Sequence, residues 1–302
     1  MTSHDVIVVG GGPAGLTAAI YLARFHLRTL VIDNGLSRAL MIPVTHNHAG
    51  YPAGIAGRVL VERMREQAVR YGAVLSDATA TTVAGEQGAF RVEAGSMLQA
   101  RAILLATGVR NRRPPMADAL HDRAVATGRL RYCPICDGYE VTDKNIAVIG
   151  SGEHGASEAL FLRGYSRDVT LIAADGEHDL DGAQRAALGS VGVGIVAGPA
   201  TAFRLSKAGI SLGTAQGRRM FDSVYPALGS TVHSDLARAL GAETGSDGGI
   251  VVDGHQRSSV PGLYAAGDVV LGLDQISHAM GEGGVAASTI RNDLALIQPL
   301  LR

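Results

Sequence analysis

The chain contains only two cysteines, and they are spaced C-x-x-C in the segment 132–138, which reads YCPICDG. In such a pair one thiolate can attack a disulfide while the other thiol resolves the product, and the motif lowers the pKa of a thiol towards neutrality. Asp137 follows the second cysteine directly, where it could exchange a proton with a departing thiolate. We therefore predict thiol–disulfide chemistry carried by Cys133, Cys136 and Asp137.

Other roles for the same residues stay open. A tetrahedral zinc site needs four ligands, and the nearest imidazoles, those of His121 and His154, form no recognisable ligand spacing with the cysteines. We therefore expect no metal. The two thiols could also be buried and inert, and Asp137 could serve only to form a turn before Gly138. A disulfide framework like that of secreted scaffolds is excluded, because two thiols are too few for one.

A glycine-rich turn near the start of the chain lies between a predicted strand and a predicted helix. Residues 6–9 are a β-branched run typical of a buried parallel strand, and residues 16–24 have helical character. A second apolar run over residues 29–32 ends at Asp33. The intervening segment 10–15 reads GGGPAG. This order, with an acid about 20 residues after the glycines, is the dinucleotide-binding fingerprint in its required context.

Each glycine of this turn has a physical task. The first permits the tight turn, the second lets the backbone approach a pyrophosphate, and the third lets the helix pack closely on the strand. The N-terminus of the helix then faces the anion. The residues predicted to bind the dinucleotide here are Gly10, Gly12, Pro13, Ala14 and Gly15.

The same pattern recurs in the middle of the chain. Residues 145–149 predict a strand, residues 150–155 (GSGEHG) a turn, and residues 156–162 a helix. A further strand is predicted over residues 169–172. The glycines of the second turn are Gly150, Gly152 and Gly155. Two such units imply two bound dinucleotides, or one dinucleotide and a vestige.

Two further apolar segments predict strands that end against a ligand. Residues 103–108 end in Thr-Gly, and residues 262–268 end in Gly-Asp. Ligands of doubly wound sheets lie beyond the carboxyl ends of the strands, so these ends are candidate binding positions. They comprise Thr107, Gly108, Gly267 and Asp268. Asp268 could also cap the helix that follows, and both roles can hold at once.

The two units predict an α/β fold with two Rossmann-like dinucleotide-binding domains, the second inserted into the first. A length of 302 residues fits two domains. Pro114-Pro115 and the glycine-rich stretch 241–249 are the best junctions. We therefore predict that residues 1–113 and 245–302 form one discontinuous domain, and that residues 114–244 form a central domain carrying the C-x-x-C pair.

Charge and hydropathy narrow the range of partners. The chain has 27 Lys and Arg against 28 Asp and Glu, a net charge of −1, so it lacks the electrostatic footprint of a protein that binds nucleic acid or anionic membranes. The first residues, MTSHD, contain no basic region of a signal peptide. The apolar stretch 6–23 holds glycines and a proline, which predict a strand, a turn and a helix instead of a membrane span. We expect a cytoplasmic protein with no nucleic-acid or membrane partner.

Together these elements resemble the low-molecular-weight thioredoxin reductase family of FAD-dependent pyridine nucleotide-disulfide oxidoreductases. The resemblance covers essentially the whole chain, and its motifs are highly specific in this order and spacing. They are residues 10–15, the loop 47–52 (family form Asn-x-x-x-Pro-Gly), and residues 106–108, 133–138, 150–155 and 260–268. The resemblance implies FAD at the first turn, NADPH or NADH at the second, a thioredoxin-like protein or a small disulfide as substrate, and a homodimer.

The resemblance also implies roles for single residues. Asp33 would hold the adenosine ribose of FAD, and Asp268 the ribityl chain. Cys136 would lie by the flavin and Cys133 would attack the substrate, while a twisting of the two domains would bring the flavin in turn to the nicotinamide and to the cysteines. A helix after Ser277 would point its N-terminus at the flavin ring. The other residues assigned to FAD by the resemblance are Asn47, Thr107, Gly108, Gly267, Gln275 and Ile276.

The second dinucleotide site departs from the family pattern. Members that use NADPH end the second strand of the central domain with His-Arg-Arg, whereas residues 171–179 of this chain read LIAADGEHD. A 2′-phosphate favours guanidinium donors, and here it would meet Asp175, Glu177 and Asp179. The sequence therefore disfavours NADPH, and Asp175 could instead hold the free 2′-hydroxyl of NADH.

This departure leaves three alternatives open. The site could take no nicotinamide and receive electrons from a small protein donor. Electrons could also run outward, from a small dithiol through Cys133, Cys136 and FAD to oxygen, as in the dithiol oxidases that share this fold and the C-x-x-C pair. A third alternative is a non-catalytic flavin-bound redox sensor.

A second departure concerns the implied flavin ring. Family members have Arg-Gln where this chain has Asp274-Gln275. His278 follows and could protonate a group at the ring, but we expect it to pack against a backbone carbonyl at the helix start. His46 and His48, in and beside the loop 47–52, are expected to be solvated.

Overall fold

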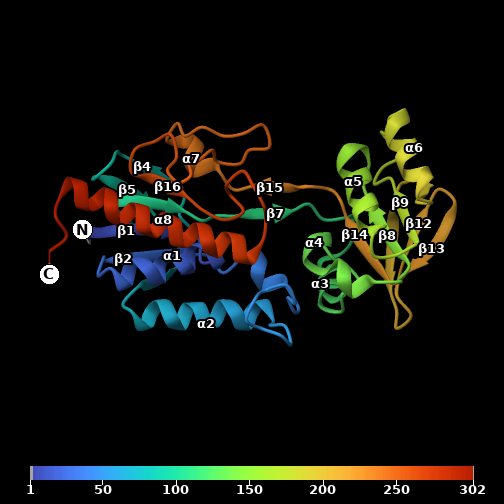
Figure 1. The fold of residues 1–302 in the computed structure, drawn as a ribbon, viewed down its shortest axis with the longest axis horizontal. Coiled ribbons are helices and arrows are strands. Elements are labelled where there is room, and N and C mark those ends of the chain that lie inside the picture. Colours follow the sequence, from blue (N-terminus) through green and yellow to red (C-terminus); the bar gives the residue numbers. More distant parts are fainter. Residues whose placement is uncertain (1–2, 302) are drawn as a thin grey trace.

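The computed structural model describes residues 3–301 and arranges them as two bodies joined by a narrow connection (Figure 1). The first body, at left in the figure, holds both ends of the chain and a large sheet. The second body, at right, is built from the middle of the chain. The predicted α/β fold with two Rossmann-like units is therefore confirmed.

The first body is organised around a seven-stranded sheet of order β3-β2-β1-β6-β5-β4, in which β16 also pairs with β6. Its strands are β1 (Ser3–Val9), β2 (Thr29–Asp33), β3 (Val74–Asp77), β4 (Thr82–Ala84), β5 (Phe90–Glu93), β6 (Met97–Leu105) and β16 (Leu263–Ala265). Strands β1, β2, β3, β6 and β16 run parallel. The first part of β6 pairs with antiparallel β5 and its last residues pair with β16. The carboxyl ends of β1, β2, β6 and β16 therefore meet at one edge of the sheet.

Helices cover one face of this sheet. They are α1 (Pro13–Arg24), α2 (Gly57–Arg70), α8 (Ile276–Ile297) and the short 3-10 helix η1 (Arg38–Met41), while α7 (Asp235–Ala239) lies with the other face. Because side chains alternate along a strand, Val6 and Val8 of β1 pack towards α1, α2 and α8, whereas Ile7 and Val9 pack towards β4, β5 and α7. The hydrophobic core thus has one layer on each face.

The second body contains a four-stranded parallel sheet of order β10-β9-β8-β14 and a three-stranded antiparallel sheet of order β11-β12-β13. Its strands are β8 (Ile146–Ile149), β9 (Val169–Ile172), β10 (Gly194–Val196), β11 (Thr201–Leu205), β12 (Ile210–Thr214), β13 (Gly217–Phe221) and β14 (Ser223–Pro226). Its helices are α3 (Asp118–Ala126), α4 (Pro134–Asp137), the 3-10 helix η2 (Gly138–Val141), α5 (Gly152–Leu162) and α6 (Gly182–Ser190). The order β8-α5-β9 repeats that of β1-α1-β2.

Two short antiparallel strands, β7 (Val109–Asn111) and β15 (Ser230–Val232), connect the bodies. The predicted boundaries after residues 113 and 244 lie on either side of this ladder and remain a prediction. Ala237 of α7 and Ala242 are buried in the same cluster as Ile7 and Val9 of β1. We propose on this basis that the second boundary lies at β15, because the residues after it belong to the core of the first body.

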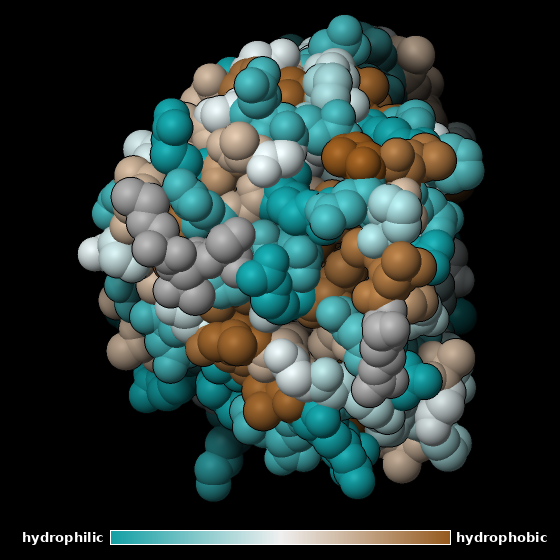
Figure 2. All heavy atoms as spheres, turned by 90° about the vertical axis from the view of Figure 1, so that its left-hand side faces the viewer, coloured by the Kyte–Doolittle hydropathy of each residue, from teal (hydrophilic) through white to brown (hydrophobic). Residues whose placement is uncertain are grey.

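Within the described residues, no helix is both long and apolar enough to cross a bilayer. Figure 2 views the end of the first body that faces away from the second. Apolar patches on this end are separated by hydrophilic side chains.

Candidate active site

The two cysteines form a disulfide at the start of helix α4 in the second body. Cys133 is the N-cap of this single turn, and its Sγ accepts a hydrogen bond from the backbone N–H of Cys136 at 3.1 Å. Pro134 occupies the first helical position, where its fixed φ suits a helix and its missing N–H costs nothing. The predicted C-x-x-C disulfide is confirmed, and both cysteines are half-buried.

Among the described residues, the hydrogen bonds that reach the disulfide from the first body come from the side chain of Gln275. The Gln275 Nε2 group donates to Cys133 Sγ at 3.4 Å and to Cys136 Sγ at 3.3 Å. Asn47 Nδ2 donates to Gln275 Oε1 at 3.0 Å, and Thr45 Oγ1 donates to Asn47 Oδ1 at 2.9 Å. The fold therefore brings Asn47 and Gln275 together with both cysteines, although the sequence associated these two residues only with FAD.

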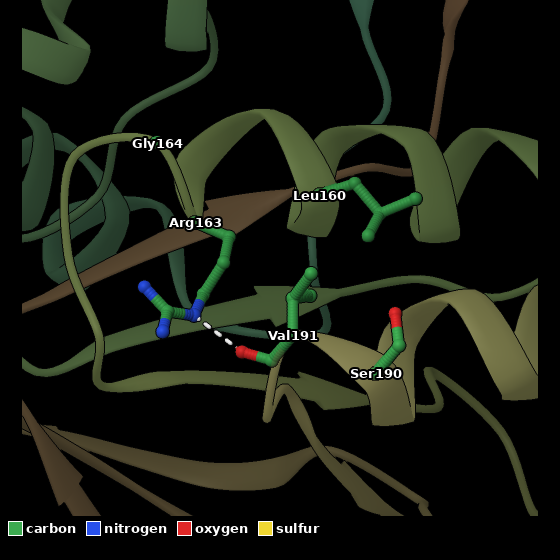
Figure 3. A pocket seen from close by; sticks show the side chains of 5 residues that line it. All are labelled: Leu160, Arg163, Gly164, Ser190 and Val191. Atoms are coloured by element: carbon green, nitrogen blue, oxygen red, sulfur yellow. Dashed lines mark hydrogen bonds between the residues drawn. The ribbon is translucent and has the colours of Figure 1, made fainter.

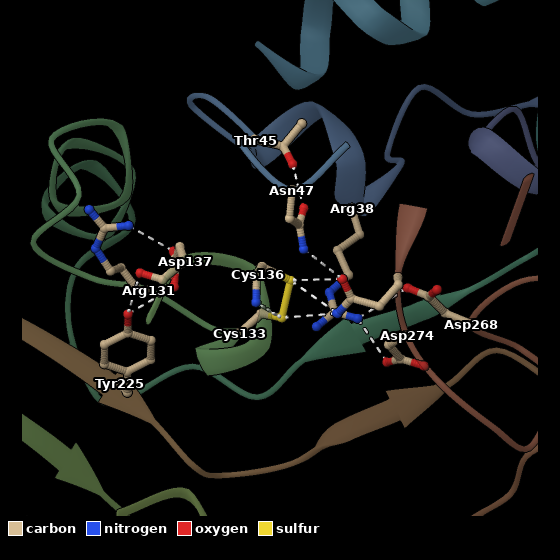
Figure 4. Close-up of a disulfide and its surroundings, with 11 residues drawn as sticks. Arg38, Thr45, Asn47, Arg131, Cys133, Cys136, Asp137, Tyr225, Asp268 and Asp274 are labelled. Carbon is tan, nitrogen blue, oxygen red and sulfur yellow. Dashed lines mark hydrogen bonds and ion pairs between the residues drawn. A yellow bond between two sulfur atoms is a disulfide. The ribbon is translucent and has the colours of Figure 1, made fainter. Parts of the chain in front are cut away.

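Asp137 lies on the other side of α4 from this contact. Its carboxylate accepts hydrogen bonds from Arg131 Nη1 and from the Tyr225 hydroxyl, each at 2.8 Å, and it points away from the disulfide in Figure 4. Burial raises the pKa of Asp137, and the charge and hydrogen bond of Arg131 oppose that rise. The acid–base role of Asp137 remains a prediction. The sequence analysis predicted neither partner of Asp137. The one local signal was that Arg131, a basic residue, lies close to this acid in the chain.

The first glycine turn has the close backbone packing that its glycines were expected to allow. Gly10 has φ +112°, and a Cβ there would lie 2.2 Å from the carbonyl oxygen of Ala106. A Cβ at Gly15 would lie 2.0 Å from the carbonyl oxygen of Gly10. Helix α1 begins at Pro13 after Gly12, with no side chain capping its first N–H groups. These N–H groups are therefore available to an anion, as a dinucleotide pyrophosphate requires.

Two predicted acids at this edge are already paired with arginines that no motif contains. Asp33 ends β2, is buried, and pairs with Arg65 Nη1 at 2.8 Å. Arg38 Nη1 lies 3.1 Å from Asp268 Oδ2 and 2.8 Å from Asp274 Oδ2. Burial and the charge of Asp268 raise the pKa of Asp274, against the charge of Arg38. Arg38 thus supplies a positive charge beside the position where the family pattern has its own arginine.

The remaining residues of the predicted flavin set lie around the same edge. Thr107 and Gly108 follow β6, and Thr107 Oγ1 donates to the carbonyl of His233 at 2.7 Å. The N–H of Gly267, which follows β16, donates to Glu282 Oε2 at 2.6 Å. Gln275 and Ile276 are the N-cap and first residue of α8.

One expectation about the histidines was wrong. His278 does not rest on a backbone carbonyl: its Nε2 pairs with Glu282 Oε1 at 3.0 Å, because residues four apart share one face of a helix. His48 is half-buried, stacks on Tyr51, and lies 3.0 Å from Ser277 Oγ, since the loop that carries it folds against the start of α8. His46 is exposed, as predicted.

The second glycine turn is covered by the segment 176–181 of the same chain. The Ser151 hydroxyl accepts a hydrogen bond from the Asp179 N–H at 2.7 Å and lies 3.3 Å from His178 Nδ1. His178 is buried, with its Nε2 2.8 Å from the carbonyl oxygen of Val196. Gly152 has φ +59° and starts α5, while Asp175 is exposed. These contacts of Ser151 with His178 and Asp179 were not anticipated from the sequence.

A shallow hollow of about 510 Å³ lies between the ends of α5 and α6 (Figure 3). Its lining includes Leu160, Arg163 and Val191, and Arg163 Nε donates to the carbonyl of Val191 at 2.6 Å. None of its lining residues belongs to the predicted site. The hollow is therefore separate from the residues predicted to carry the chemistry of this chain.

Comparison with known proteins identifies the family and the fold of the chain. A model of the pyridine nucleotide-disulphide oxidoreductase family matches residues 4–283. The chain is 31% identical to a thioredoxin reductase of Treponema pallidum, over 98% of this chain and 99% of that protein. The crystal structure of HlmI is 30% identical, with a TM-score of 0.87 over 96% of this chain and 92% of that one. A thioredoxin reductase of Streptococcus pyogenes, 23% identical, has the same fold, with a TM-score of 0.88 over 97% of this chain and 99% of that one.

Proposed function

This chain belongs to the pyridine nucleotide-disulphide oxidoreductase family, and we propose that it passes electrons between FAD and a disulfide substrate through Cys133 and Cys136. The predicted resemblance to thioredoxin reductases is confirmed, and the chain is a flavoprotein disulfide oxidoreductase of that type. The single observation that carries the proposal is the contact of both sulfurs with Gln275. This contact joins the disulfide of one body to the edge of the other body where we propose that FAD binds.

We propose that FAD binds along the edge where the parallel strands of the first body end. The N–H groups at the start of α1 would bind the pyrophosphate, and Asp33 would accept a hydrogen bond from the ribose with the oxygen lone pairs that Arg65 leaves free. FAD supplies a group that takes up and releases two electrons. The proposed FAD residues are Gly10, Gly12, Pro13, Ala14, Gly15, Asp33, Asn47, Thr107, Gly108, Gly267, Asp268, Gln275 and Ile276.

The identity of the electron donor is a separate part of the proposal. A nicotinamide dinucleotide would bind at Gly150, Gly152 and Gly155, with Asp175 on its ribose, and NADH suits this acidic site better than NADPH. The segment 176–181 favours a second candidate, because its contacts with Ser151 lie where the dinucleotide would approach. In that candidate a small dithiol or a small protein donor reduces the enzyme without a nicotinamide, and oxygen can accept the electrons of the dithiol.

One anaerobic titration separates these candidates. The purified protein is first examined for a flavin spectrum, and NADH, NADPH or a small dithiol is then added without oxygen. Rapid bleaching of the flavin by either nicotinamide supports a reductase. Bleaching by the dithiol alone supports the oxidase, and slow bleaching by all three supports a redox sensor. A colourless protein that takes up no added flavin would overturn the proposal.

We also propose that the oxidised partner is a thioredoxin-like protein or a small disulfide, that the chain forms a homodimer, and that it acts in the cytoplasm. The first suggestion is supported by the Treponema pallidum relative, which is a thioredoxin reductase. Both cysteines are only half-buried, which is compatible with either kind of substrate.

A further inference from the structure

We propose that Gln275, held in place by Asn47, decides which sulfur carries the negative charge after the disulfide is reduced. Cys133 would be the thiolate and Cys136 the neutral thiol. The inference rests on the proposed function, because it concerns the same sulfur pair. It differs from the family-based expectation for Gln275, which concerned FAD alone.

The two sulfurs have different hydrogen-bond surroundings. In the part of the chain that the structure describes, Cys133 Sγ faces two N–H donors and no hydrogen-bond acceptor: the backbone N–H of Cys136 at 3.1 Å and Gln275 Nε2 at 3.4 Å. Cys136 Sγ faces Gln275 Nε2 at 3.3 Å, and it also lies 3.7 Å from Gln275 Oε1, within reach of a thiol donor. Donors stabilise a thiolate, whereas an acceptor stabilises the protonated thiol. The additional donor at Cys133 and the acceptor at Cys136 both favour the negative charge on Cys133 Sγ.

The orientation of the Gln275 amide is fixed from its far side. Asn47 Nδ2 donates to Gln275 Oε1, so a flipped amide would set two N–H groups against each other. The Thr45 hydroxyl donates to Asn47 Oδ1 and fixes Asn47 in turn. Thr45 is buried and exchanges two backbone hydrogen bonds with Ile55. Gln275 therefore touches the reacting atoms, and Asn47 is a positioning residue.

The redox step balances without a proton from Gln275. Two electrons from the flavin and one proton from solvent cleave the S–S bond, giving the Cys133 thiolate and the Cys136 thiol. The thiolate then attacks one sulfur of the substrate disulfide, and the other substrate sulfur leaves as a thiolate that takes a proton from solvent. Gln275 donates hydrogen bonds to both sulfurs while the bond between them is cleaved.

The test measures the pH dependence of thiol alkylation in the full-length protein. Single-thiol variants Cys136→Ser and Cys133→Ser are reduced with dithiothreitol, desalted without oxygen and reacted with iodoacetamide from pH 5 to 10. We expect the midpoint of Cys133 to lie below the ordinary thiol value of about 8.5, and that of Cys136 to lie at or above it. In the Cys136→Ser background, Gln275→Leu should raise the Cys133 midpoint by about one pH unit and slow alkylation at pH 7 about tenfold.

Two further variants separate the proposed role from a general disturbance. Asn47→Leu should raise the midpoint less than Gln275→Leu, and the double variant should match Gln275→Leu alone, because both act through one amide. Gln298→Leu is the matched control, since Gln298 is exposed at the opposite end of α8, and it should leave the midpoint unchanged. If Gln275→Leu does not fold, Asn47→Leu decides the question by itself.

An unchanged midpoint in Gln275→Leu or Asn47→Leu, or a lower midpoint for Cys136 than for Cys133, would overturn the inference. The alkylation needs neither a nicotinamide nor oxygen. If the midpoint shifts as expected in a protein whose flavin no donor reduces, this inference therefore holds and the proposed function is wrong. If a donor reduces the flavin but the midpoint does not shift, the inference alone is wrong.

Discussion

At the scale of single residues, the carboxylate of Asp137 shows how the second body holds its reactive turn. Arg131 and Tyr225 both bond to it, so the last residue of α4 is tied to the end of strand β14. Burial raises the pKa of Tyr225, which therefore stays a neutral donor. A direct proton exchange between Asp137 and a sulfur requires the carboxylate to turn, because it points away from the disulfide (Figure 4).

Replacement of Arg131 by Met tests this network. The folded-state pKa of Asp137 is raised by burial, so ionisation of this carboxyl costs stability as the pH rises through that pKa. Without Arg131 the pKa rises further. We expect a loss of about 2 kcal/mol at pH 7 and a smaller loss at pH 4, measured by urea unfolding. Arg123→Met, at an exposed position on α3, is the control. A loss of stability in Arg131→Met that is equal at pH 4 and pH 7 would contradict this expectation.

At the scale of the elements, α1 and α8 approach so closely that a side chain at one glycine has no room. A Cβ at Gly283 would lie 2.3 Å from the carbonyl oxygen of Ala14, whereas one at Gly281 would meet nothing within 4 Å. Both glycines lie inside α8. The close approach also positions the N-terminus of α8, and hence Gln275, relative to the first glycine turn.

The pair of variants Gly283→Ala and Gly281→Ala isolates this packing. Alanine favours a helix over glycine by about 1 kcal/mol, so Gly281→Ala should raise the free energy of unfolding. Gly283→Ala should lower it by about 2 kcal/mol, because the helices must move apart. Denaturant unfolding of both variants measures the difference, and equal effects would show that the contact is not tight.

The segment 176–181 is a second element whose position can be tested, through Ser151→Ala. Loss of the hydroxyl removes the bond from the Asp179 N–H and the contact with His178. If this segment restricts access to the second glycine turn, NADH should bleach the flavin of the variant faster than the flavin of the parent. Ser157 is exposed on helix α5, which follows Ser151, so Ser157→Ala should behave like the parent. Unchanged bleaching in Ser151→Ala would show that the segment does not control access.

At the scale of the whole molecule, the contacts between the two bodies include the three-residue ladder of β7 and β15 and the hydrogen bonds of Gln275 to the sulfurs. The proposed homodimer needs a further surface on one of them. Tyr21 and Val285 lie exposed beside a shallow hollow between α1 and α8.

Sedimentation velocity tests whether a second copy covers this hollow. We expect a species of twice the 31.2 kDa chain mass, and a monomer for Val285→Glu, because a carboxylate would lose its hydration in the interface. Val59→Glu, on α2 and exposed to a similar extent, should leave the dimer intact. A monomeric parent protein would contradict the homodimer, and two variants that behave alike would contradict this choice of surface.

The amino-acid sequence alone determined the features that depend on neighbours along the chain. The strand–turn–helix units at residues 10–15 and 150–155 and the disulfide of Cys133 with Cys136 are local, because spacing and backbone freedom decide them. Only the tertiary structure decided which distant groups meet them. Gln275 reaches the sulfurs from the other body, and Tyr225 reaches Asp137 from a strand 88 residues away. Such contacts depend on how the two sheets and their connection are packed in three dimensions, and no local pattern records that packing.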